Sequence, residues 1–214
     1  MILAIYCAGG LGREIIELAR YINKWERIIF VDDVTEVKTC ADADVFRFEE
    51  IEQFRGNIEF VIANGEPAVR EKLYIKIKKA GYLLGKVIHP NASIWPNAFI
   101  GEGVIMYDAT VSANAIVEDN VLLNGRGSIG HDVTLGAHSV LSHLSFVGGA
   151  AKIGRSCYIA PGAMIKDRVT IGDYAIVSLG AIVLRTVKPK SIMIGNPAKK
   201  IGENTQNKVF EIFS

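Results

Sequence analysis

Residues 121–154 read VLLNGRGSIGHDVTLGAHSVLSHLSFVGGAAKIG, and an aliphatic residue recurs at every sixth position of this stretch. The same register continues outside the stretch in both directions. An α-helix repeats every 3.6 residues and ordinary strands vary in length, so neither element sustains a period of six. The period predicts short parallel strands joined by tight turns, each with one aliphatic side chain pointing inward. The thirteen register positions are Val111, Val117, Leu123, Ile129, Leu135, Leu141, Val147, Ile153, Ile159, Ile165, Ile171, Val177 and Val183.

Three such hexads would close one triangular coil, and each inward side chain would stack on its counterpart in the next coil. A small residue or valine lies two positions before every aliphatic residue, and glycine often follows it. Burial of each inward side chain contributes roughly 1.5–3 kcal/mol. The sequence therefore predicts a parallel β-helix of about five coils. It ends after Val183, because Pro189 and Pro197 cannot continue the ladder.

The first half of the chain alternates strand and helix patterns instead. Apolar runs predict buried strands at residues 2–6, 27–31 and 58–62, and residues 83–88 are a candidate for a fourth. A helix is predicted after the first strand and another after the third. This alternation indicates a small, Rossmann-like parallel α/β sheet with right-handed crossovers. The predicted domains are an α/β ligand-binding domain over residues 1–90, a β-helix domain over 91–201 and a closing segment over 202–214.

The composition excludes several classes of partner and location. The chain has 214 residues, half of them apolar, and a net charge of +1, which gives no electrostatic case for nucleic acid or an anionic membrane. No apolar run approaches the ~18 residues that a membrane-spanning helix needs. The three cysteines lack disulfide or zinc-finger spacing, and the N-terminus lacks the basic region of a signal peptide. We therefore expect a cytoplasmic protein.

Three polar or glycine-rich segments follow the three predicted strands. A glycine turn at residues 9–12 follows the first, Asp32 and Asp33 follow the second, and residues 63–65 follow the third. Ligands of parallel sheets bind beyond the carboxyl ends of the strands, where glycines let a phosphate approach a helix N-terminus. An NAD site is a weaker alternative, because Cys7 replaces the first glycine of Gly-x-Gly-x-x-Gly. A purely structural turn is the other alternative.

His131 is the candidate general base of the β-helix. It follows the inward-pointing Ile129 by two residues, at a predicted corner of the prism, and Asp132 comes next. Its stacking neighbours in the adjoining coils, Ala113 and Gly149, are small and leave space around the ring. A carboxylate beside an imidazole orients it and raises its basicity, as general-base catalysis needs. The alternative is a solvated corner pair without a chemical role.

His138 and His143 are predicted at the two other corners, so one chain could hardly bring all three histidines onto one metal ion. The spacing His138-x4-His143 resembles that of the zinc ligands of the gamma-class carbonic anhydrases, which share this type of helix. That resemblance implies a third histidine near residue 102, where this chain has Glu102. A zinc hydratase therefore stays a minor alternative. Packing or hydrogen bonding between subunits is the other alternative for these two side chains.

The whole chain resembles the bacterial nucleotide-sugar acetyltransferases, a branch of the hexapeptide-repeat acyltransferases that includes UDP-4-amino-sugar N-acetyltransferases and sialic acid O-acetyltransferases. The shared segments are AGGLGRE (8–14), DD (32–33), IANG (62–65), LLNGRGSIGHDVTLG (122–136) and IGNPAKKI (194–201). The resemblance implies a left-handed β-helix and a homotrimer with active sites between subunits. It also implies acetyl-CoA-dependent N-acetylation of a nucleotide-linked amino sugar for surface-glycan (lipopolysaccharide) biosynthesis.

The resemblance also implies roles for individual residues. His131 would be the base that assists direct attack of a sugar amine on the thioester. Asp132 would adjust the basicity of the His131 imidazole. This chain departs from the family in having Asp132 in place of glutamate and Leu11 in place of a frequent histidine. Acylation of a sugar hydroxyl and a non-catalytic trimeric scaffold stay open, and no metal is expected. The nucleotide would contact Gly10, Leu11, Gly12, Asp32, Asp33 and Gly65, and acetyl-CoA would contact Asn124, His138, Gly149, Pro161, Leu179 and Gly180.

Overall fold

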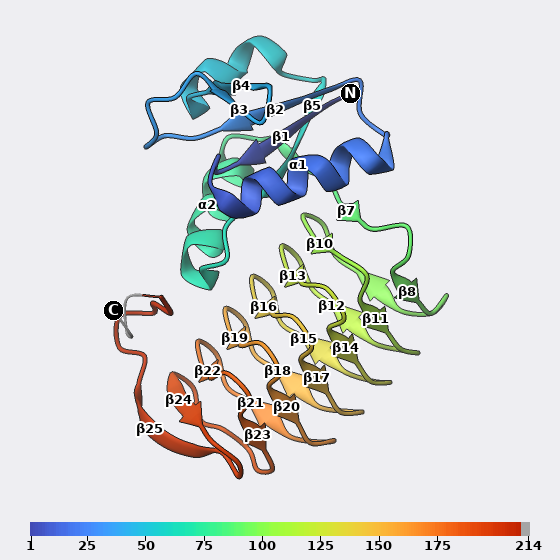
Figure 1. Ribbon diagram of the computed structural model, residues 1–214, viewed down its shortest axis with the longest axis vertical. Coiled ribbons are helices and arrows are strands. Elements are labelled where there is room, and N and C mark those ends of the chain that lie inside the picture. The colour runs from blue at the N-terminus through green and yellow to red at the C-terminus, as the bar shows by residue number, and fades with distance from the viewer. Residues whose placement is uncertain (211–214) are drawn as a thin grey trace.

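The computed structural model describes residues 1–210 and contains an α/β sheet domain above a triangular β-prism (Figure 1). The sheet has the strand order β3-β4-β2-β1-β5-β6. Its central strands β1, β2 and β5 are parallel, and they have the residue bounds that the sequence predicts. The elements are β1 (Ile2–Tyr6), α1 (Gly10–Ile22), β2 (Arg27–Val31), β3 (Thr39–Cys40), β4 (Ala43–Phe46), the 3₁₀ helix η1 (Phe48–Phe54), β5 (Ile58–Ile62), α2 (Pro67–Lys79) and β6 (Leu83–Leu84).

The prism consists of two-residue strands, each hydrogen-bonded to the strand one coil away. Three faces result, which we name the β13 face (β7, β10, β13, β16, β19, β22), the β14 face (β8, β11, β14, β17, β20, β23) and the β15 face (β9, β12, β15, β18, β21). The strands are β7 (Val87–Ile88), β8 (Ser93–Ile94), β9 (Phe99–Ile100), β10 (Ile105–Met106), β11 (Thr110–Val111), β12 (Ile116–Val117), β13 (Leu122–Leu123), β14 (Ser128–Ile129), β15 (Thr134–Leu135), β16 (Val140–Leu141), β17 (Phe146–Val147), β18 (Lys152–Ile153), β19 (Tyr158–Ile159), β20 (Met164–Ile165), β21 (Thr170–Ile171), β22 (Ile176–Val177) and β23 (Ile182–Val183).

The second residue of each of these strands points inward. Ile129, for example, pairs with Val111 in the preceding coil and with Val147 in the following one, and all three side chains are fully buried in one core that runs along the prism. All thirteen register positions belong to this core. The predicted fold class, an α/β sheet domain followed by a left-handed parallel β-helix, is therefore confirmed.

The candidate fourth strand at residues 83–88 is two strands in the structure. β6 extends the α/β sheet beside β5, whereas β7 pairs with β10 and begins the prism. The ladder thus starts at Val87, a few residues before the predicted boundary at 91. The antiparallel pair β3–β4 and the helix η1 were not predicted.

Helix α2 attaches the α/β domain to the prism edge between the β15 and β13 faces, which we name the third edge. The guanidinium of Arg70 is fully buried there and donates to the carbonyl oxygens of Ile62, Asn64 and Asn120. Burial lowers the pKa of Arg70 to about 9, so the group stays charged at neutral pH. One turn later, the Tyr74 hydroxyl lies 2.7 Å from the Glu102 carboxylate, to which it donates, and 3.1 Å from that of Asp119. The domain contact is therefore polar and specific.

The end of the described chain closes the prism and then returns towards α2. β24 (Ser191–Ile194) and β25 (Lys199–Glu203) form an antiparallel hairpin, and the backbone N–H groups of Val209 and Phe210 donate to the Glu66 carboxylate. Residues 211–214 of the predicted closing segment lie outside the described residues. Within residues 1–210, the two α-helices are too short and too polar to cross a bilayer.

Candidate active site

His131 and Asp132 occupy the turn after β14, at the edge between the β14 and β15 faces, which we name the second edge. His131 Nδ1 lies 2.7 Å from Asp132 Oδ2, and the side chains are 68% and 50% exposed. The hydrogen bonds from His131 and Asn114 lower the pKa of the Asp132 carboxyl, so it is an ionised acceptor. The neutral imidazole must then carry its proton on Nδ1, which leaves the Nε2 lone pair for accepting a proton. Among residues 1–210, Nε2 has no hydrogen-bond partner.

Gly149 forms the floor beneath the imidazole. A Cβ atom at this position would lie 2.6 Å from His131 Nε2, so only glycine admits the ring in this place. The backbone N–H of Ala150 donates to the carbonyl of His131, which keeps the two turns in register. Gly149 was predicted from the family resemblance to contact the cofactor. The structure places it beside the candidate base.

His138 lies at the third edge, beneath α2, and not in an open site. Its side chain is buried, its Nδ1 lies 3.1 Å from the Asn120 amide, and its ring packs on Tyr74. Burial lowers the pKa of His138. We therefore withdraw the predicted contact of His138 with acetyl-CoA, because the side chain belongs to the domain interface. His143 is exposed at the remaining edge, between the β13 and β14 faces, which we name the first edge.

The three histidines thus lie at three different edges of one prism, as the repeat predicts. Glu102, which takes the place of the third zinc ligand in the hydratase alternative, accepts hydrogen bonds from Tyr74 and Lys78 instead. The part of the chain that the structure describes contains no group of three or more His, Cys, Asp or Glu side chains arranged to hold a metal ion.

The glycines of the turn before α1 have different environments. Gly9 and Gly10 are exposed, and a Cβ atom at Gly9 would meet nothing within 4 Å. At Gly12, by contrast, a Cβ atom would lie 2.4 Å from the Cys7 carbonyl oxygen and 3.0 Å from the Phe30 ring. The predicted contact of Gly12 with a nucleotide stays a prediction, because these distances concern only the Cβ side of the residue. Gly12 is buried and lets α1 pack closely on the sheet.

We expect Gly12→Ala to lower the free energy of unfolding by about 2 kcal/mol, because the Cys7 backbone must shift to admit the methyl group. Gly9→Ala is the matched control and should change it by less than about 0.5 kcal/mol. Urea denaturation of both variants measures the difference. Equal stability of the two variants would contradict this assignment.

The two aspartates after β2 are occupied by contacts within the chain. Asp32 accepts hydrogen bonds from the backbone N–H groups of Ala8, Val34 and Thr35. Although burial opposes them, these bonds lower the pKa of Asp32. Asp33 is likewise held by Tyr6, Lys76 and the backbone of η1. Both carboxylates therefore shape the loops at the sheet edge, and their direct contact with a nucleotide stays a prediction.

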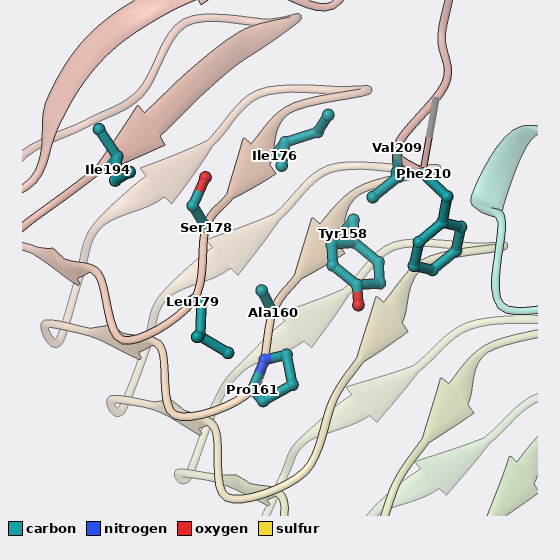
Figure 2. A pocket seen from close by; sticks show the side chains of 9 residues that line it. All are labelled: Tyr158, Ala160, Pro161, Ile176, Ser178, Leu179, Ile194, Val209 and Phe210. Carbon is teal, nitrogen blue, oxygen red and sulfur yellow. The ribbon is translucent and has the colours of Figure 1, made fainter. Parts of the chain in front are cut away.

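Four of the predicted acetyl-CoA residues form a column along the first edge. They occupy equivalent turns after β13, β19 and β22, and the backbone N–H of Gly180 donates to the carbonyl of Pro161 at 3.0 Å. A cavity of about 350 Å³ adjoins this column and is mostly apolar (Figure 2). It lies on the lower part of the β13 face and does not include His131. The column is Asn124, Pro161, Leu179 and Gly180, and the cavity is lined by Tyr158, Ala160, Pro161, Ile176, Ser178, Leu179, Ile194, Val209 and Phe210.

Phe210 is a candidate site residue that sequence reasoning missed. Its ring lies against Tyr158 in the cavity, with 5.5 Å between ring centroids, and a Cβ atom on Gly65 would lie 3.6 Å from it. Phe210 therefore connects the cavity to the loop after β5, where Gly65 was predicted to contact a nucleotide. No local pattern signals this contact, because the two residues are far apart in the sequence.

Comparison with known proteins supports both halves of the fold. Residues 2–77 match the model of the PglD N-terminal domain family. A putative serine acetyltransferase from Schizosaccharomyces pombe is 33% identical over 118 residues, which are 55% of this chain and 39% of that protein. The chain thus spans about two fifths of the length of that curated relative.

Two solved structures resemble nearly the whole chain. The acetyltransferase domain of PglB from Neisseria gonorrhoeae FA1090 has a TM-score of 0.88 at 27% identity, over 94% of this chain and 99% of that one. A mutant of GDP-perosamine N-acetyl transferase from Caulobacter crescentus, solved with CoA and GDP-perosamine, has a TM-score of 0.72 at 25% identity, over 95% and 98%. Both are similar to this chain in the α/β domain as well as in the β-helix.

Proposed function

We propose, on the premise that this chain belongs to the nucleotide-sugar acetyltransferase family, that it transfers the acetyl group of acetyl-CoA to the amino group of a nucleotide-linked amino sugar. The observation that carries the proposal is the exposed His131–Asp132 pair, whose geometry leaves Nε2 ready to accept a proton. The similarity to an N-acetyl transferase solved with an amino sugar favours an amine over a hydroxyl as the acceptor.

The proposed reaction needs one base and no covalent enzyme intermediate. The amine nitrogen attacks the thioester carbonyl carbon, and the C–S bond breaks as the amide forms. His131 Nε2 takes the proton that the amine loses, and this proton then passes to the departing CoA thiolate. Asp132 stabilises the imidazolium that forms in between. Cys157 is excluded as a nucleophile, because it is buried in the prism core.

For the nucleotide, we propose the carboxyl edge of the α/β sheet. The first N–H groups of α1, at residues 10–12, have no partner within the helix, and the exposed Gly9 precedes them. Such a terminus suits a pyrophosphate. Asp32 holds the neighbouring loop in place, and Gly65 lies in the loop after β5 at the same edge of the sheet.

For acetyl-CoA, we propose the first-edge column and the adjoining apolar cavity, which fits a pantetheine arm. Within one chain, however, this column and His131 lie on opposite sides of the β14 face. The site is therefore incomplete in one chain, and a second copy must bring its first edge to His131.

We propose a homotrimer, supported by the outward side chains of Phe146, Met164 and Ile182, which stack on the β14 face. Two of them are exposed, Phe146 by 44% and Met164 by 48%.

Replacing Phe146 by glutamate tests this arrangement. We expect the trimer to dissociate and acetyl transfer to fall by about 100-fold, because a carboxylate cannot be buried in an apolar contact without a partner. Lys152→Glu, at the equivalent outward position of the β15 face, is the control and should stay trimeric. Analytical ultracentrifugation measures the mass of both variants. A trimeric, fully active Phe146→Glu variant would refute the proposed interface.

The proposed function is tested by incubating the protein with acetyl-CoA and a panel of nucleotide-linked sugars that carry either an amine or only hydroxyls. We expect CoA release with an amino sugar, and a product whose acetyl group resists hydroxylamine, as an amide does and an ester does not. An ester product would indicate O-acetylation. If no sugar makes CoA release faster than it is without the protein, the result would support the scaffold alternative.

We propose that the reaction takes place in the cytoplasm, where acetyl-CoA and nucleotide sugars are available, and that it serves surface-glycan biosynthesis.

A further inference from the structure

The carboxylate of Asp132 has a different partner on each oxygen. Oδ2 lies 2.7 Å from His131 Nδ1, and Oδ1 accepts a hydrogen bond of 3.0 Å from the side-chain amide of Asn114. Asn114 lies in the preceding coil, eighteen residues before Asp132, at the same second edge of the prism. The proposed base is therefore connected to a side chain that the reaction does not involve directly.

Asn114 is itself held by Asn97, which lies one coil earlier still. The Asn97 amide donates to Asn114 Oδ1 at 2.7 Å, and its oxygen accepts from the Asn114 backbone N–H at 3.3 Å. The spacing here is seventeen residues, because the turn between β10 and β11 is one residue shorter than the equivalent turns and so shortens this coil. The two asparagines nevertheless meet across that shortened coil. A chain of three hydrogen bonds thus runs along the second edge, from Asn97 through Asn114 and Asp132 to His131.

The direction of this chain is fixed by its carboxylate end. An ionised carboxylate only accepts hydrogen bonds, so Asn114 must present its NH₂ group to Asp132 and its oxygen to Asn97. Asn97 then has to donate through its own NH₂ group. Each NH₂ group in the chain therefore meets an acceptor with one of its N–H bonds, and each amide has one orientation. Such second-layer hydrogen bonds hold a functional group in its working geometry.

We infer that Asn114, held by Asn97, is a positioning residue that fixes the Asp132 carboxylate against His131. Asp132 is half exposed, and its backbone is in the left-handed region at φ +57°. Without a second partner, its carboxylate would exchange the imidazole for water. The inference rests on the proposed function, because it gives the aspartate a purpose only if His131 is the base.

The kinetic test uses Asn114→Gly, because Asn114 has φ +58° and glycine removes the amide without straining the backbone. We expect kcat to fall about tenfold, with the KM for acetyl-CoA unchanged, as for the loss of one hydrogen bond to a charged group. Asn23→Gly, at φ +54° in the α/β domain, is the matched control and should keep the wild-type kcat. Asn97→Ala should have a smaller effect in the same direction.

A double-mutant cycle separates positioning from a general structural effect. In an Asp132→Asn background, Asn114→Gly should cause no further loss of kcat, because the carboxylate that it orients is gone. Additive losses, or a wild-type kcat in Asn114→Gly itself, would overturn the inference.

A measurement without turnover keeps the inference testable even if the substrate proposal fails. In ¹⁵N spectra of histidine-labelled protein, the His131 signals are those that disappear in His131→Asn. We expect the Nδ1-protonated tautomer in the wild type and a mixture of tautomers in Asn114→Gly. An unchanged tautomer in Asn114→Gly would contradict the inference. If the tautomer changes but no sugar is acetylated by the wild type, the proposed function fails and the positioning role of Asn114 stands.

Discussion

His131→Asn is expected to lower kcat for acetyl transfer about 10³-fold, the middle of the range for loss of a general base. The substitution keeps a polar side chain of similar reach but removes the imidazole, whose Nε2 is the proposed proton acceptor. The KM for acetyl-CoA should change less than about threefold, because His131 is proposed to take a proton from the amine and not to hold CoA. Release of the CoA thiol, followed with a thiol reagent, measures both constants.

His89→Asn is the control for this substitution. His89 lies in the first coil, where its ring stacks on Tyr21, and we assign it no part in the reaction. It should retain the wild-type kcat. If His131→Asn also retains kcat within about threefold, His131 is not the base, and the proposed mechanism is wrong whatever the substrate.

Arg70→Met is expected to lower the free energy of unfolding by about 3–5 kcal/mol. Methionine has a similar length, yet it donates no hydrogen bond. The carbonyl groups of Ile62, Asn64 and Asn120 would lose their donor at 2.6–3.1 Å while they stay buried. Because these carbonyls belong to both domains, the contact between the α/β domain and the prism should weaken most.

Urea denaturation at one fixed protein concentration measures this loss, and hydrogen exchange locates it. Arg185→Met, at an exposed position near the end of the repeat, is the control and should change stability by less than about 0.5 kcal/mol. We expect faster exchange in α2 of Arg70→Met than in the prism core. Equal stability of the two variants would contradict this prediction. It would mean that the hydrogen bonds of the buried Arg70 guanidinium only offset the free-energy cost of burying its charge.

The prism could be predicted from the sequence because its signal is local and repeated. Each coil tests the same rule, that an aliphatic side chain at the sixth position points inward, and Ile129 and its twelve counterparts all obey it. Strands β1, β2 and β5 were equally predictable, since each is a largely apolar run, broken only by Arg27 and Glu59, and most of its residues are buried. The division of residues 83–88 was not, because pairing across the sheet decides which strand each half joins.

The candidate site was only partly predictable, because several roles depend on how the domains pack. Nothing in the repeat indicates that α2 covers the turn of His138, or that Gly12 faces the Cys7 carbonyl while Gly9 faces open space. The asparagine chain that leads to Asp132 did carry a signal. Asn114 precedes Asp132 by one full coil, so the repeat that predicts the core also places these two side chains together.

A crystal structure with CoA and a nucleotide-linked amino sugar would show whether His131 meets the amine at a contact between subunits. We predict that the sugar nitrogen lies about 3 Å from His131 Nε2 of one subunit, with the CoA sulfur held at the first edge of a neighbouring subunit. A sugar nitrogen bound beyond hydrogen-bond reach of every His131, or CoA and sugar meeting at another edge of the prism, would contradict it.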